Sequence, residues 1–425
     1  MNTNQVSPQR DWKQTFGLIW VGQAFSLLGS QLVQFALIWY LTEKTGSAAV
    51  LATATFVEII PRVVLGPFAG ALVDRWNRKR VMIVADALIA AFVVCLGALF
   101  FFNLIQIWHI YLLIFLRALG GAFHWPAMRA STSLLVPEKH LSRVAGMNSA
   151  LQGVFSIGVP PMAAILLKSV PMYAILAIDV TTAALAILPL LIAHIPQPDS
   201  SGMEALTSPR VLINDVRFGF KYLVNWKGML ILGLSAALVN FLINPAFTLL
   251  PLLVTKYFQK GVVELGLMES LFGMGVISGG LLLGVWGGFK KKILTTYLGV
   301  FGVALGVFII AFAPADLFNV ALVGMLVSGV MISLTNGPLF AVMQSAVPAN
   351  LQGRVFTAIE STTSFMSPIG MLAAAPVAEW LGVRGWFFLA ALGCVCMGLM
   401  GLASHDVMDI EEQGKARQQA AINAR

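Results

Sequence analysis

Long apolar runs alternate with short polar turns along almost the whole chain. Twelve runs are long enough for a membrane-spanning helix, which needs about 20 apolar residues. They start near Thr15, Ala48, Val81, Gln106, Leu141, Met172, Met229, Val263, Ile293, Asp316, Val355 and Gly385. The runs are continuously apolar, and every backbone polar group must be satisfied inside lipid, so they indicate helices and not barrel strands. The predicted fold class is an all-α membrane protein with twelve transmembrane helices.

Composition agrees with this pattern. Of the 425 residues, 58% are hydrophobic and 11% are charged, whereas soluble domains carry about 25% charge. The net charge of +8 could indicate nucleic-acid binding, but the placement of the bases is better explained by topology. With a cytoplasmic N-terminus, most bases fall at inner ends of the runs, and the outer ends hold Lys44, Lys168, Lys256, Lys260 and Arg384. The positive-inside rule therefore predicts a plasma (inner) membrane protein with both termini cytoplasmic and no nucleic-acid partner.

The chain repeats itself weakly. Val136-Pro137 matches Val347-Pro348, and Arg143 is in register with Arg354, both at an offset of 211 residues. An offset of about half the length predicts two six-helix halves. The expected organisation is an N-terminal half over 1–195, a cytoplasmic central loop over 196–228, a C-terminal half over 229–404 and a cytoplasmic tail over 405–425.

The central loop and the tail are polar. From Pro209 to Trp226, apolar positions alternate with bases such as Arg217 and Lys221. This pattern suggests an amphipathic helix on the inner membrane face, with an ordinary cytoplasmic linker as the alternative. The tail after Ser404 is expected to be solvated.

One very short turn concentrates charge. Gly70–Arg80 holds one acid and four bases between two apolar runs, and it resembles the loop signature of the major facilitator superfamily, G-x-L-x-D-R-x-x-R-K. The resemblance implies a transporter that alternates between inward- and outward-open states, with this loop latching its two halves together. The gating residues would be Gly70, Asp74, Arg75, Arg78 and, at the eleventh span, Arg354. Alternatively, the bases only fix topology; the corresponding loop of the second half, Gly287–Lys292, lacks an acid.

Two charged groups lie well inside predicted spans. Arg117 falls about mid-way along the fourth span, where an arginine is expected to face the bundle interior with a partner. Its context, Leu116 to Gly121, resembles the superfamily signature R-x-x-x-G, which implies a part in proton transfer. Glu58 and Arg62 are four residues apart, a spacing that favours pairing on one helix face. Each group could instead form a purely structural ion pair.

Further acids inside spans are candidates for proton coupling. They are Asp179, Glu269 and Glu360. Buried carboxylates can load and release protons near neutral pH, although an acid near a helix end can simply reach water. Asp179 ranks first, followed by Glu58, Glu360 and Glu269.

Polar side chains at helical spacing suggest a cavity lining. Gln23, Ser26, Ser30 and Gln34 share one helical face, and the resemblance implies that Asn240, Asn244 and Asn336 lie on other pathway helices. Hydrogen bonding between helices is the alternative. The sequence contains no G-x-x-x-x-G-K-[ST] loop and no His/Cys spacing typical of a metal site. We therefore expect no enzyme activity, no cofactor and no metal.

Several local runs narrow the resemblance. Tyr40 to Ala48, Leu65-Gly66-Pro67, Ala85-Asp86, Gly121 to His124 and Ala177-Ile178-Asp179 are similar to the macrolide-efflux subgroup of drug:proton antiporters. This similarity implies proton-coupled export of bulky amphiphiles across the lipid bilayer by a monomer. The alternatives are an exporter of a siderophore or other endogenous amphiphile, a symporter or uniporter for a small solute, and a non-transporting membrane protein of the same fold.

Overall fold

The computed structural model describes residues 12–193, 195 and 209–423. It divides into two compact units. The N-terminal unit comprises Met1–Tyr40 and Val57–Ser208, and the C-terminal unit comprises Leu41–Phe56 and Pro209–Arg425. The predicted central loop between the halves spans 196–228, and its first part, 196–208, lies outside the described residues.

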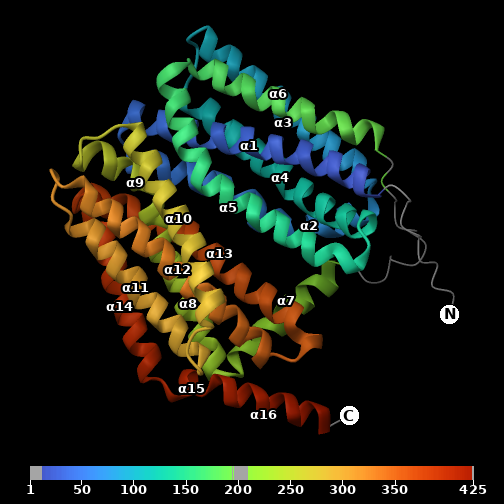
Figure 1. The fold of residues 1–425 in the computed structure, drawn as a ribbon, viewed down its shortest axis with the longest axis vertical. Coiled ribbons are helices and arrows are strands. Elements are labelled where there is room, and N and C mark those ends of the chain that lie inside the picture. The colour runs from blue at the N-terminus through green and yellow to red at the C-terminus, as the bar shows by residue number, and fades with distance from the viewer. Residues whose placement is uncertain (1–11, 194, 196–208, 424–425) are drawn as a thin grey trace. The chain divides into compact units, whose positions relative to one another are not determined.

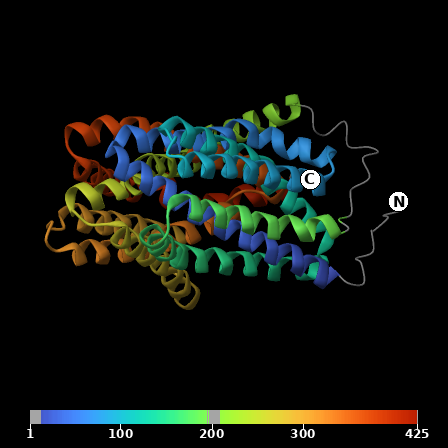
Figure 2. The ribbon, with the colours of Figure 1, turned by 90° about the horizontal axis from the view of Figure 1, so that it is seen from above.

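Six long helices carry the first six apolar runs (Figure 1). They are α1 (Trp12–Thr45), α2 (Ala48–Arg75), α3 (Arg78–Phe101), α4 (Ile107–Leu135), α5 (Glu138–Ser169) and α6 (Met172–Ile192). Helix α3 packs against both α4 and α6. In Figure 2 the blue-to-green helices of this unit run along a common direction, as expected for segments that must each cross the same bilayer.

The charged turn between α2 and α3 has a defined structure. Asn77 caps α3, because its side-chain oxygen accepts a hydrogen bond from the Arg80 N–H at 3.1 Å. Lys79 Nζ donates to the carbonyls of Leu191 and Ala193 at 2.8 and 2.9 Å. A cation at the carboxyl end of α6 satisfies terminal carbonyls and complements the helix dipole. Helix α3 therefore begins at Arg78, before the predicted start at Val81.

The C-terminal unit is also helical. Its elements are α7 (Pro209–Val224), α8 (Lys227–Thr248), α9 (Leu250–Leu252), the π-helix η1 (Leu253–Tyr257), α10 (Val262–Trp286), α11 (Lys292–Phe312), α12 (Phe318–Ala346), α13 (Ala349–Trp380), α14 (Val383–Ala403), α15 (His405–Met408) and α16 (Ile410–Asn423). Helix α12 packs against α10 and α11. Gly275 permits part of this contact, since a Cβ there would lie 2.9 Å from the Cα of Gly329. Small residues let helix backbones approach closely in lipid.

Eleven helices of the described chain are long and apolar enough to span a membrane. Helix α13 is a further helix of 32 residues, and it is less apolar because it carries Arg354, Glu360 and Glu379. At 1.5 Å per residue it is longer than the roughly 30 Å hydrocarbon core. The predicted all-α membrane fold is confirmed, and the helices are consistent with twelve spans.

The predicted helix in the central loop is present as α7. It packs on α13 and α8, and Gly219 lies directly against the Arg354 carbonyl, where a Cβ would clash. Leu223 is 6% exposed at its end. Helix α7 is thus a packed part of the C-terminal unit, and its place on the membrane face stays a prediction.

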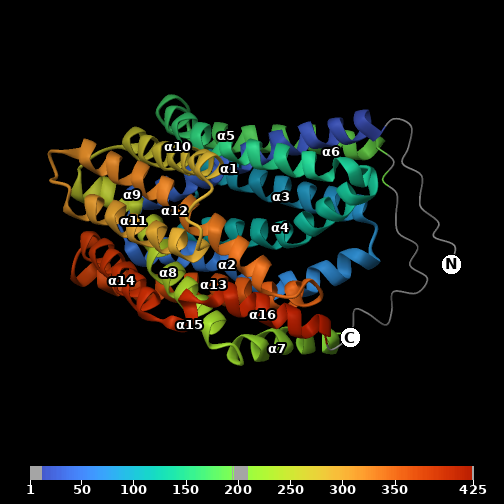
Figure 3. The same ribbon diagram turned by 60° about the horizontal axis from the view of Figure 1, so that its bottom comes forward.

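The expectation of a solvated tail is wrong for the first part of the tail, whereas Ala416 and Arg417 further along are exposed. Val407 and Ile410 are fully buried, and Gln413 Oε1 accepts a hydrogen bond from Trp226 Nε1 at 2.9 Å. Lys227 pairs with Asp406 at 2.9 Å. Figures 1 and 3 both place α16 beside the junction of α7 and α8. The few large apolar side chains of the tail stand among many charged and amide residues, so the sequence did not signal this packing.

Candidate functional site

The N-terminal unit contains a cavity of about 550 Å³. Its walls come from α1, α2, α3, α4 and α5. The four predicted polar residues of α1 all line it: Gln23, Ser26, Ser30 and Gln34. The apolar part of the wall includes Trp20, Trp125 and Met128. Such a mixture of broad apolar surface with a few polar groups is typical of a site for a small organic molecule.

Arg117 reaches from the cavity wall to the leading proton candidate, Asp179. Its Nη1 donates to Asp179 Oδ2 at 2.7 Å, and the two side chains are 11% and 3% exposed. Its Nη2 donates to the Ser30 carbonyl at 3.0 Å, while Ser30 Oγ donates to Asp179 Oδ1 at 3.2 Å. The sequence placed all three residues in spans but could not show this contact. A buried charge-assisted pair with further hydrogen bonds connects α1, α4 and α6 at one point.

Close packing of α1 on α6 holds this ion pair in place. A Cβ on Gly29 would clash with Thr182 Oγ1 and lie 3.0 Å from the Cα of Asp179. Thr182 Oγ1 also donates to the Asp179 carbonyl at 3.0 Å. Gly29 therefore allows Ser30, its neighbour on α1, to reach the Asp179 carboxylate.

The predicted Glu58–Arg62 pair is present, but it is open to the cavity. Arg62 Nη2 lies 3.5 Å from Glu58 Oε1, and the side chains are 59% and 28% exposed. Gln34 Nε2 donates to Glu58 Oε2 at 2.9 Å. An ion pair of this exposure contributes little to stability, which leaves both charges available to a bound molecule.

Asp86 on α3 is a second buried acid, and it was not among the candidates for proton coupling predicted from the sequence. Asp86 Oδ1 lies 3.3 Å from His124 Nε2, and the side chains are 8% and 17% exposed. Gln23 Nε2 donates to Asp86 Oδ2 at 3.2 Å. All three residues line the cavity. The available signal was an acid within the third apolar run, since an ionisable residue inside a span is a functional candidate by default.

The candidates in the C-terminal unit do not form a comparable cluster. Asn240 Nδ2 donates to the Ala236 carbonyl, and Asn244 Nδ2 donates to Asn240 Oδ1, both at 2.9 Å within α8. Asn336 on α12 and Glu360 on α13 are exposed, whereas Glu269 on α10 is partly buried. The cavity role of the three asparagines stays a prediction.

The gating residues are described only in part. Arg78 is buried, and its Nη1 donates to the Ala130 carbonyl at 3.1 Å. The Arg354 guanidinium lies 5.4 Å from the centre of the Phe218 ring, a cation–π distance. The backbone of Gly70, Asp74 and Arg75 belongs to α2, but the structure does not describe their surroundings, so the Asp74 latch stays a prediction.

The basic loop Gly287–Lys292 of the C-terminal unit contains no acid of its own, and acids of the tail pair with it. Lys291 Nζ lies 3.4 Å from Asp409 Oδ1 and 3.7 Å from Glu412 Oε1. Glu411 Oε1 accepts a hydrogen bond from the Ile293 N–H at 3.0 Å, at the start of α11. These acids follow the loop by more than a hundred residues, so the local pattern of the loop could not reveal them.

Long apolar helices, a charged turn after the second helix and ion pairs beside a cavity are features expected of a multi-pass membrane transporter. The chain matches the Major Facilitator Superfamily over residues 19–371, and it belongs to that family.

Relatives narrow the comparison to efflux proteins. Macrolide efflux protein A of Streptococcus pyogenes is 36% identical over 390 residues, covering 92% of this chain and 96% of that protein. The protein of the same name from Enterococcus faecalis is 34% identical over 326 residues, covering 77% and 100%. The predicted resemblance to the macrolide-efflux subgroup is thereby confirmed. The solved structure of nucleoside transporter NupG shares the fold, with a TM-score of 0.67, 15% identity, and coverage of 92% and 99%.

Proposed function

We propose that this chain is a proton-coupled efflux transporter that exports bulky amphiphilic compounds, such as macrolide-type drugs, by alternating access. The observation that carries the proposal is the 36% identity to Macrolide efflux protein A, which extends over 92% of the chain. A similarity of that extent covers both units and is not limited to a single motif.

The cavity of the N-terminal unit supports an amphiphilic substrate. Its volume of about 550 Å³ lies within the range of sites for drug-sized molecules, about 300–1,000 Å³. Trp20, Trp125 and Met128 offer broad, adaptable apolar contact, while Gln23 and Gln34 offer hydrogen bonds. A site built for a small sugar would need more hydrogen-bonding groups and less apolar surface.

The Asp179–Arg117 pair supports proton coupling. A proton on Asp179 Oδ2 would remove the charge that holds Arg117 Nη1 at 2.7 Å, and the guanidinium would then need another acceptor. Proton binding would therefore loosen α4 from α6 and from the Ser30 carbonyl of α1. Asp86 with His124 is a second candidate for proton exchange, because the two side chains lie 3.3 Å apart and both line the cavity. Glu58, Glu360 and Glu269 follow.

Alternation would be controlled at the charged turn. In this proposal Asp74 latches the outward-open state, with Arg75 and Arg78 ordering the turn and Arg354 as the partner in the other half. The N-cap by Asn77 and the Lys79 contacts with α6 support a turn whose geometry is fixed.

We also propose a monomer in the plasma (inner) membrane with both termini cytoplasmic. A green fluorescent protein fused after Arg425 should then fluoresce, because this protein folds in the cytoplasm.

Transport by the purified chain in proteoliposomes tests the function. An imposed pH gradient alone should drive movement of a radiolabelled macrolide, and a protonophore should abolish it. Cells expressing the chain should accumulate less of the same drug than cells expressing Asp74→Asn. Undiminished movement with the gradient collapsed, or a strict requirement for sodium, would reject proton coupling; no movement of any amphiphile would reject efflux.

A further inference from the structure

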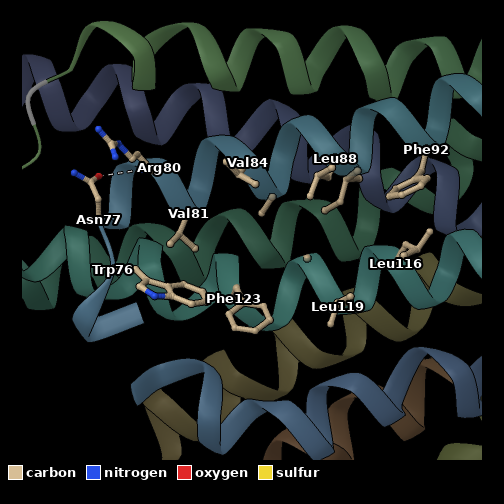
Figure 4. Close-up of a pocket in the computed structure, with 13 residues that line it drawn as sticks. Trp76, Asn77, Arg80, Val81, Val84, Leu88, Phe92, Leu116, Leu119 and Phe123 are labelled. Carbon is tan, nitrogen blue, oxygen red and sulfur yellow. Dashed lines mark hydrogen bonds between the residues drawn. The ribbon is translucent and has the colours of Figure 1, made fainter. Parts of the chain in front are cut away.

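A second pocket lies on a different face of the N-terminal unit. It is an apolar groove of about 540 Å³ between α3 and α4 (Figure 4). Its walls include Val84, Leu88 and Phe92 from α3 and Leu116, Leu119 and Phe123 from α4. Val84 and Leu88 are 54% and 53% exposed. The groove thus opens to the surroundings of the unit and is separate in its lining from most of the charged cavity.

One end of the groove is polar and basic. Trp76, Asn77 and Arg80 lie there, and Figure 4 shows them at the opposite end from Phe92. The Arg80 side chain is exposed, and the Asn77 cap on its backbone N–H fixes where the side chain starts. The Trp76 ring stacks on Phe123 at 6.0 Å between centroids. This arrangement combines a cation and an interfacial tryptophan with a purely apolar channel.

The length of the channel matches one lipid leaflet. Arg80 and Phe92 are twelve residues apart on α3, which corresponds to about 18 Å of helix. Half of a hydrocarbon core is about 15 Å. In the predicted topology the Arg80 end lies at the cytoplasmic surface, where anionic lipids attract basic groups.

We propose that this groove binds an anionic phospholipid of the inner leaflet, with one acyl chain along α3 and α4 and the phosphate at Arg80. The charge decides between two amphiphiles. A cationic amphiphile would place its charge against the guanidinium and be repelled, whereas a lipid phosphate can accept charge-assisted hydrogen bonds from it. Lys79 is the neighbouring base, but it is engaged with the carbonyls at the end of α6.

Lipid affinity of the purified full-length chain tests the site without relying on transport. Native mass spectrometry compares phosphatidylglycerol with phosphatidylcholine of identical acyl chains. The parent should retain phosphatidylglycerol more tightly. Arg80→Gln should weaken it about fivefold, the effect of about one basic residue near a membrane surface, and weaken phosphatidylcholine less, because choline already offsets the charge of that lipid's phosphate. Lys139→Gln is the matched control, because it removes one exposed cation from the start of α5, outside the groove.

A groove-filling variant tests the acyl chain separately. Val84→Trp should weaken both lipids, since it occupies the channel; if that protein is not recovered, Leu88→Gln should do the same by making the channel polar. Glycerol phosphate, which has the phosphate and no acyl chain, should not compete. Equal retention of the two lipids by the parent overturns the proposal, as does a loss in Lys139→Gln equal to that in Arg80→Gln, or competition by glycerol phosphate.

Discussion

The Arg117–Asp179 pair should make the larger electrostatic contribution of the two arginine–carboxylate pairs in the N-terminal unit, and a double-mutant cycle can measure it. At 2.7 Å and an effective dielectric constant of about 20, the attraction is about 6 kcal/mol. Part of this is offset by the cost of removing both charges from water. Removing only one partner leaves the other buried and uncompensated, which costs about 3–5 kcal/mol.

We therefore expect Arg117→Met and Asp179→Asn each to lower the free energy of unfolding by about 3–5 kcal/mol. The double variant should be more stable than the sum of the two losses predicts, because no charge remains unpaired. The measurement is equilibrium unfolding in mixed micelles, followed by tryptophan fluorescence.

The Glu58–Arg62 pair provides the matched control. Its members are 28% and 59% exposed, so Glu58→Gln and Arg62→Met should each change stability by less than about 1 kcal/mol. Similar losses in both cycles, or additive losses for Arg117→Met and Asp179→Asn, would refute the reasoning from burial.

Three further outcomes are expected at other positions and in other assays. Asp74→Asn should insert normally, because the bases that set orientation remain, yet fail to lower drug accumulation in cells; normal efflux by a well-expressed variant would contradict the latch. Asp179→Asn should still bind drug in an equilibrium assay but transport at a rate independent of external pH, whereas a parental pH profile would move the proton to Asp86 or Glu58. Ile410→Ala should cost the C-terminal unit about 2–5 kcal/mol, because this side chain of α16 is fully buried; an unchanged melting curve would mean that the tail does not stabilise the unit.

Helix ends show where sequence reasoning was limited. Apolar runs predicted the spans, but α3 begins at Arg78 because Asn77 caps it and Lys79 reaches the end of α6. Helix α13 begins at Ala349, six residues before the predicted start at Val355. Its first turns are polar, so the apolar run did not include them. Hydropathy locates the part of a helix that lies in lipid, whereas capping and interhelical contacts decide where it ends.

For the candidate site, the sequence identified the residues but not their contacts. The sequence identified Arg117, Asp179 and Ser30 as polar groups within spans, since any such residue is costly in lipid and stands out. It could not show that Ser30 and Arg117 both contact Asp179, nor that Asp86 faces His124. Those contacts join residues on different helices, far apart in the chain.

The class of fold, the spans and the family could be predicted from the amino-acid sequence, because lipid requires each spanning segment to satisfy its own backbone, and that information is local. The pairing of charges, the contacts of the tail acids and the position of the apolar groove depend on how the helices pack. The physical reason is that lipid and the interior of the protein are similarly apolar. Hydropathy therefore does not show which face of a helix points inward. Close contacts at positions such as Gly29 determine that orientation, and with it the partner of each buried charge.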